Sequence, residues 1–106
     1  MCACAFALQY IDLAQKGQHN QAGFPNSNYG VSKALVIAWT KVLAKELSPR
    51  KILVNCCCPG YCATDMSSHR GNKSAAQGAD TPTMLALLPD GSPSGKFWSE
   101  RKMIDW

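Results

Sequence analysis

The sequence predicts an α/β chain that forms part of a doubly wound fold around a parallel sheet. A long amphipathic helix is expected from residue 29 to about residue 47, and an apolar run at residues 52–58 follows it. This run shows no alternation of apolar and polar residues, which is typical of a parallel strand covered on both faces. A shorter strand is expected near residues 96–99. Two parallel strands are rarely stable alone, so this order of helix, strand, helix and strand indicates a fraction of a larger sheet.

The helix has recognisable start and stop signals. Pro25 breaks the chain before it, and Ser27 or Asn28 can cap its free N–H groups. It ends before Pro49, and Lys45 suits the negative end of its dipole. Apolar residues form stripes on two sides of the helix, so we expect it to pack on more than one neighbour.

Tyr29 and Lys33 are four residues apart at the start of this helix. Residues at positions i and i+4 lie on one helical face, so the phenol and the ammonium share one region of space. A fixed positive charge beside a tyrosine favours the phenolate, which is what a general acid working near neutral pH needs. The alternative is structural, with Tyr29 as a half-buried aromatic residue and Lys33 as a lysine that extends to solvent.

The segment after the first predicted strand is a candidate ligand loop. Pro59-Gly60 ends the apolar run with a strong turn dipeptide, and the loop continues to about Met66. In open α/β sheets, ligands bind in the crevice beyond the carboxyl ends of the strands. The alternative is that this segment is an ordinary connection between a strand and a helix.

The chain has six cysteines. Cys56, Cys57 and Cys58 are consecutive in the predicted strand, where side chains alternate between faces, so they cannot form an ordinary disulfide framework. Cys58 and Cys62 are four positions apart rather than the three of a Cys-x-x-Cys motif, and we predict no metal site. Reduced thiols of this kind favour a cytoplasmic protein.

Length and composition indicate one globular domain and disfavour several classes of partner. The 106 residues are enough for one domain, and we expect a single partial domain over residues 1–106. The net charge of +4 comes from scattered basic residues, so we predict no nucleic-acid site. No apolar run approaches the roughly 18 residues of a membrane span, so we predict no membrane partner.

Taken together, these segments resemble the short-chain dehydrogenase/reductase family. The resemblance rests on Tyr29-x-x-x-Lys33, on the strand sequence Ile-Leu-Val-Asn, and on Cys-Cys-Pro-Gly-Tyr-x-x-Thr-Asp-Met from Cys57 to Met66. Within that family the chain is most similar to the NADPH-dependent carbonyl reductases, over roughly residues 11–106. No family segment is assigned to residues 1 to about 10.

The resemblance implies a Rossmann-type fold and the reduction of ketones, aldehydes and quinones to alcohols with NADPH. Tyr29 would give a proton to the developing alkoxide, and Lys33 would assist it and hydrogen-bond the nicotinamide ribose. Residues 67 to about 80 would form a mobile lid. The remaining implied roles are contacts to the nicotinamide from Pro59, Gly60, Cys62 and Thr64, and a substrate border formed by Tyr61 with Cys57 or Cys58.

The chain also departs from the family pattern. It has no glycine-rich turn for the cofactor pyrophosphate, and no residue corresponds to the family's catalytic serine. We therefore expect the C-terminal part of a reductase without its nucleotide-binding half, inactive by itself. The alternative is a non-catalytic truncated product or an interaction protein. Self-association through uncovered apolar faces is a further expectation of the partial fold.

Overall fold

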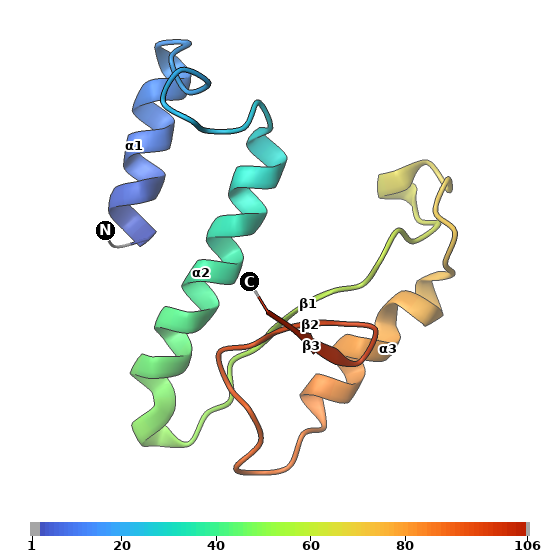
Figure 1. Ribbon diagram of the computed structural model, residues 1–106. Helices are drawn as coiled ribbons and strands as arrows, with labels where there is room; N and C mark the ends of the chain where they lie inside the picture. Colours follow the sequence, from blue (N-terminus) through green and yellow to red (C-terminus); the bar gives the residue numbers. More distant parts are fainter. Residues whose placement is uncertain (1–2, 106) are drawn as a thin grey trace. The chain divides into compact units, whose positions relative to one another are not determined.

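The computed structural model describes residues 3–105 and contains three α-helices and three short strands within that range (Figure 1). The chain divides into two compact units, residues 1–39 and 40–106, and each is described by itself. The elements are, in order, α1 (Ala3–Gln15), α2 (Asn28–Leu47), η1 (Ser48–Arg50), β1 (Cys56–Cys58), η2 (Asp65–Ser67), α3 (Ala75–Ala86), β2 (Phe97–Ser99) and β3 (Lys102–Ile104), where η marks a 3₁₀-helix.

In the first unit, aromatic side chains join α1 to the loop that precedes α2. The rings of Phe6 and Phe24 are 5.0 Å apart between centroids, and those of Tyr10 and Phe24 are 5.3 Å apart. Tyr10 is buried, and its hydroxyl donates to the Asn28 side-chain oxygen at 2.5 Å. This bond fixes the entry into α2 from a helix that the sequence analysis did not predict.

The predicted long helix is confirmed as α2, with Ser27 as its N-cap. The Gly30 amide donates to Ser27 Oγ at 3.0 Å, and the Val31 amide donates to the Ser27 carbonyl at 3.0 Å. The side-chain bond satisfies an amide that has no partner inside the helix. Lys45 lies in the last turn, where a cation interacts favourably with the helix dipole.

The second unit is built on a three-stranded sheet in the order β1-β2-β3. β1 pairs with β2 in parallel, with Cys57 opposite Trp98, and β2 pairs with β3 in an antiparallel ladder. The parallel pair is connected through α3, which contacts β1 (Figure 1). The predicted order of strand, helix and strand is therefore confirmed, and it is the crossover unit from which doubly wound folds are assembled.

The predicted strand at residues 52–58 is too long, because only its last three residues form a ladder. Val54 instead receives a hydrogen bond from the Gly95 amide at 2.7 Å, and its own amide donates to Ser94 Oγ at 2.9 Å. The Lys96 amide donates to the Asn55 side-chain oxygen at 3.0 Å. One backbone bond and two side-chain bonds thus take the place of a regular ladder before Cys56. Coverage on both faces was also wrong for this chain, since Cys58 is exposed.

The third strand, β3, was not predicted. It returns from β2 through a two-residue turn in which Glu100 and Arg101 both have positive φ, at 51° and 61°. A turn with both central residues in the left-handed region suits the twist of a hairpin and usually contains asparagine or glycine. Glutamate and arginine carry no such signal, so the hairpin was missed.

Few side chains are removed from solvent in the described part of the chain. The buried apolar residues are Tyr10, Val31, Ala44 and Trp98, each between 4% and 8% exposed. Many large apolar side chains remain on the surface, with Met66 at 84% and Leu87 at 77%. Among residues 3–105, no helix combines the length and the apolar content needed to cross a bilayer.

The N-cap of α2 provides the first testable prediction. Ser27→Ala removes the acceptor of the Gly30 amide and should destabilise the start of α2 by about 1 kcal/mol. Amide hydrogen exchange at Gly30 and Val31 measures this loss. Ser32→Ala is the matched control, because Ser32 is exposed and its hydroxyl donates back to the Tyr29 carbonyl within the helix. Equal exchange in the two variants would contradict the capping role.

Candidate functional site

Tyr29 and Lys33 lie on one face of the first turns of α2, as the spacing predicts. The Lys33 ammonium is 5.4 Å from the centroid of the Tyr29 ring, and Tyr29 is 64% exposed. A cation at this distance from the ring centroid is attracted to the aromatic ring. The pair is therefore a phenol donor open to solvent with a fixed positive charge beside it. Both residues belong to the first unit.

The other predicted site residues lie together in the second unit, in β1 and in the loop that leaves its carboxyl end. Gly60 has φ of +81°, a conformation that favours glycine, and it turns the chain sharply after Pro59. The Gly60 amide donates to Cys58 Sγ at 3.4 Å. The Cys62 thiol donates to the Pro59 carbonyl oxygen at 3.5 Å. Two thiols thus bracket the turn.

The thiols of β1 differ in exposure. Cys58 is exposed, whereas Cys57 is half-buried. Burial raises the pKa of the Cys57 thiol above its ordinary value, and the neighbouring Cys56 and Cys58 raise it further. Cys57 is therefore a neutral, weakly nucleophilic thiol at pH 7.

The described cysteines are free thiols, and Cys2 lies outside the described residues. Within residues 3–105, no three histidine, cysteine, aspartate or glutamate side chains gather as ligands for a metal ion.

The loop is held by residues that the sequence analysis did not assign. Ser67 Oγ donates to the Cys62 carbonyl at 2.6 Å, and it accepts the Thr64 amide at 3.1 Å. The Ala63 amide donates to the Lys73 carbonyl at 2.7 Å, and the Lys73 amide donates to the Tyr61 carbonyl at 3.2 Å. These bonds fold residues 67–73 back onto residues 61–64. Only three-dimensional proximity identifies Ser67 and Lys73, so no sequence signal could have found them.

The mobile lid expected at residues 67 to about 80 stays a prediction, and the structure shows how this segment is built. Residues 75–80 are the first half of α3, which begins with a capping box between Ser74 and Gln77. The Gln77 amide donates to Ser74 Oγ at 3.1 Å, and the Ser74 amide donates to the Gln77 side chain at 2.8 Å. The N-terminal half of the expected lid is bonded to the loop, and the C-terminal half is regular helix.

Two glycines allow the close approach of this segment to Cys62. A Cβ at Gly71 would lie 2.0 Å from the Cys62 carbonyl carbon. A Cβ at Gly78 in α3 would lie 2.3 Å from Cys62 Sγ. Neither position has room for a side chain while Cys62 stays in place, so the shape of the loop depends on both glycines.

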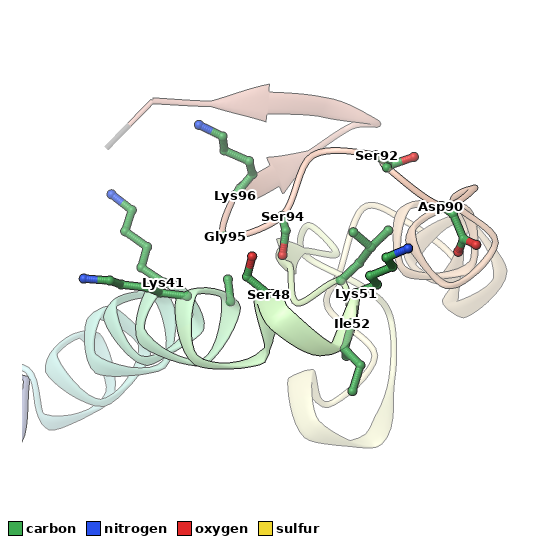
Figure 2. Close-up of a pocket in the computed structure, with 13 residues that line it drawn as sticks. Lys41, Ser48, Lys51, Ile52, Asp90, Ser92, Ser94, Gly95 and Lys96 are labelled. Atoms are coloured by element: carbon green, nitrogen blue, oxygen red, sulfur yellow. The ribbon is translucent and has the colours of Figure 1, made fainter.

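A hollow of about 930 Å³ lies elsewhere in the second unit, between the end of α2, residues 51–53 and residues 90–96. Figure 2 shows Ser48 and Ser94 in its middle and Asp90 at one end. Its walls carry four lysines, at positions 41, 45, 51 and 96. None of the predicted site residues lines it. Cations near the carboxyl end of α2, such as Lys45, interact favourably with the helix dipole.

Comparison with known proteins gives consistent results. The family model described as short chain dehydrogenase matches residues 15–75. Carbonyl reductase (NADPH) 1 of Rattus norvegicus is 42% identical over 92% of this chain, and the human protein of the same name is 40% identical. The chain spans 38% of the length of these curated relatives.

A solved structure is also similar. Salutaridine reductase from Papaver somniferum superposes with a TM-score of 0.82 and 34% identity, over 91% of this chain and 33% of that one. This match shows that the β1-α3-β2 crossover of the second unit is part of a Rossmann-type α/β fold.

The contact between Gly78 and Cys62 can be tested with a double-mutant cycle. Gly78→Ala should displace the Cys62 side chain and destabilise the chain, although alanine is the better helix former by about 1 kcal/mol. In the Cys62→Ala background the collision with Sγ is absent, so Gly78→Ala should then be neutral or stabilising. The free energy of unfolding of the four proteins measures the coupling. Additive effects would show that the two residues do not touch.

Proposed function

Because the chain belongs to the short-chain dehydrogenase family, we propose that it serves the NADPH-dependent reduction of carbonyl compounds to alcohols. The observation that carries the proposal is the exposed Tyr29 with the Lys33 ammonium 5.4 Å from its ring. The substrates are ketones, aldehydes and quinones, whose carbonyl oxygen accepts the proton that Tyr29 donates. The names of the curated relatives support this choice of cofactor and of reaction.

Proton transfer is the step that this chain's own residues perform. When bound, NADPH supplies the hydride that reduces the carbonyl carbon. Negative charge then develops on the substrate oxygen, and the Tyr29 hydroxyl gives it a proton as the C–H bond forms. Lys33 favours the resulting phenolate through its positive charge, and its remaining N–H groups are available to the ribose hydroxyls.

The cofactor assignment is consistent with the donor chemistry of the described residues. An ammonium and a phenol on one helix face suit a ribose diol beside a reacting carbonyl. Backbone groups at Pro59, Gly60 and Cys62, together with Thr64, are assigned to the nicotinamide. The substrate border is assigned to Tyr61, which is 57% exposed, and to the thiols of Cys57 and Cys58.

The proposal places the protein in the cytoplasm, where thiols stay reduced. Five cysteines are free in the described part of the chain, in keeping with a reducing compartment.

The roles of Tyr29 and Lys33 can be tested in a chimera in which this chain replaces the matching part of rat carbonyl reductase 1. Tyr29→Phe should abolish turnover of a quinone and leave NADPH binding nearly intact, because only the acid proton is lost. Lys33→Ala should weaken both, since one ammonium serves the phenol and the ribose. Steady-state kinetics and an NADPH fluorescence titration separate the two effects.

Lys41→Ala is the matched control, because it removes a lysine from α2 outside the Tyr29 face. It should change neither turnover nor cofactor binding by more than about twofold. A Tyr29→Phe chimera that kept most of its turnover would show that another group donates the proton.

Self-association of the isolated chain forms a second part of the proposal. The support is the exposure of large apolar side chains such as Met66 and Leu87 on the second unit. Each such side chain gains about 1.5–3 kcal/mol when it is removed from water. The sedimentation coefficient should therefore rise with protein concentration, and less so for Met66→Gln/Leu87→Gln. A sedimentation coefficient that does not change with protein concentration would contradict this.

A further inference from the structure

The side chain of Lys73 lies flat against the turn at Gly60. Three of its atoms, Cδ, Cε and Nζ, are 3.0–3.1 Å from the place that a Cβ of Gly60 would occupy. Gly60 itself has positive φ and follows Pro59 at the carboxyl end of β1. The lysine stem therefore supports the turn from the side where other residues would carry their own side chain.

The backbone of Lys73 is joined to the same loop. Its carbonyl accepts the Ala63 amide at 2.7 Å, and its amide donates to the Tyr61 carbonyl at 3.2 Å. These two bonds form an isolated parallel bridge between Cys62 and Lys73. One residue thus contacts the loop twice, by its backbone at residues 61–63 and by its side chain at Gly60.

The far end of the Lys73 side chain is fixed by Glu100. The ammonium forms an ion pair with a Glu100 carboxylate oxygen, and the lysine side chain is 28% exposed. The hydrogen bond with Glu100 raises the pKa of Lys73, and the negative charge of Glu100 adds to this effect against the opposing effect of burial. Lys73 is therefore a cation throughout the neutral range.

Glu100 in turn occupies a position that the hairpin defines. It is the first central residue of the β2–β3 turn, and Arg101 is the second. Arg101 ties the turn to α3, because its amide donates to Thr81 Oγ1 at 3.1 Å and its guanidinium pairs with Asp80 at 2.8 Å. The Glu100 carboxylate is thus presented from a turn that is anchored independently of the loop.

We propose that Lys73 and Glu100 are positioning residues, with the Lys73 side chain acting as a strut that holds the turn at Gly60 against the β2–β3 hairpin. The inference rests on the proposed function, because it assigns the held loop, residues 59–64, to the nicotinamide of NADPH. The strut sets the backbone that the cofactor meets, and it takes no part in proton transfer. Its loss should therefore raise the KM for NADPH more than it lowers kcat.

Hydrogen exchange on the chain itself tests the strut without cofactor. Lys73→Met keeps the length of the stem and removes the charge, and it should accelerate exchange of the Ala63 amide by about tenfold. Glu100→Gln should produce a similar change, and Lys73→Arg should restore slow exchange because the ion pair is kept. The matched control is Asp12→Asn, which breaks the exposed ion pair of α1 with Lys16 and touches neither the loop nor the hairpin.

Kinetics of the rat chimera test the consequence for the cofactor. Lys73→Met should raise the KM for NADPH about 10-fold or more, since small displacements of positioning groups are costly, and should change kcat by less than about threefold. Lys73→Arg should restore the KM. Unchanged Ala63 exchange in Lys73→Met would overturn the strut, as would equal acceleration in Asp12→Asn.

Amide exchange and the kinetics of the chimera distinguish a failure of the strut from a failure of the proposed function. Faster exchange in Lys73→Met with an unchanged KM for NADPH would overturn the positioning role but keep the contact. A chimera without substitutions that neither binds NADPH nor reduces a quinone would overturn the proposed function, and the exchange result would stand independently of it.

Discussion

Parallel pairing of β1 with β2 is the constraint from which the second unit follows. Two strands that run in the same direction cannot be joined by a tight turn, so the chain must cross over between Cys58 and Phe97. Residues 59–74 and α3 make that crossing. The Pro59-Gly60 turn consequently lies at the carboxyl end of β1, where open α/β sheets place their ligands.

The crossing segment keeps its form through Cys62 more than through any apolar core. The Cys62 carbonyl accepts from Ser67, its backbone pairs with Lys73, and its thiol lies where a side chain on Gly78 would be. Hydrogen bonds, and the absence of a side chain at Gly78, therefore stabilise this loop, as buried apolar contacts do in larger proteins. Such a loop is specified by geometry at a few backbone atoms, which is the kind of precision that a reacting carbonyl requires.

The parts that sequence patterns predicted are those governed by local rules. The caps of α2, the i and i+4 placement of Tyr29 and Lys33, and the turn after β1 all depend on residues within one or two turns of chain. The parts that were missed depend on contacts between distant residues. β1 begins late because Ser94 bonds to Val54 across 40 positions, and Lys73 reaches Glu100 across 27. Contacts between residues so far apart in the chain leave no periodicity or spacing in the sequence.

Sequence patterns also failed to predict the β2–β3 hairpin, because residues that are unusual in such turns adopt its conformation. The β2–β3 turn has the left-handed geometry that asparagine and glycine favour, yet it contains Glu100 and Arg101. The roles that the family resemblance assigned to Pro59, Gly60, Cys62 and Thr64 remain predictions, although the structure brings these four residues into one loop.

That unusual turn has a consequence for motion. A left-handed conformation costs a residue other than glycine roughly 1–2 kcal/mol, and β3 has three exposed residues in its ladder. The bonds of Arg101 to Asp80 and Thr81 therefore matter for the tip of the hairpin, which should open in brief excursions before the rest of the sheet. Each excursion withdraws Glu100 from Lys73. The loop after β1 is then coupled, through the Lys73 side chain, to the opening of the hairpin.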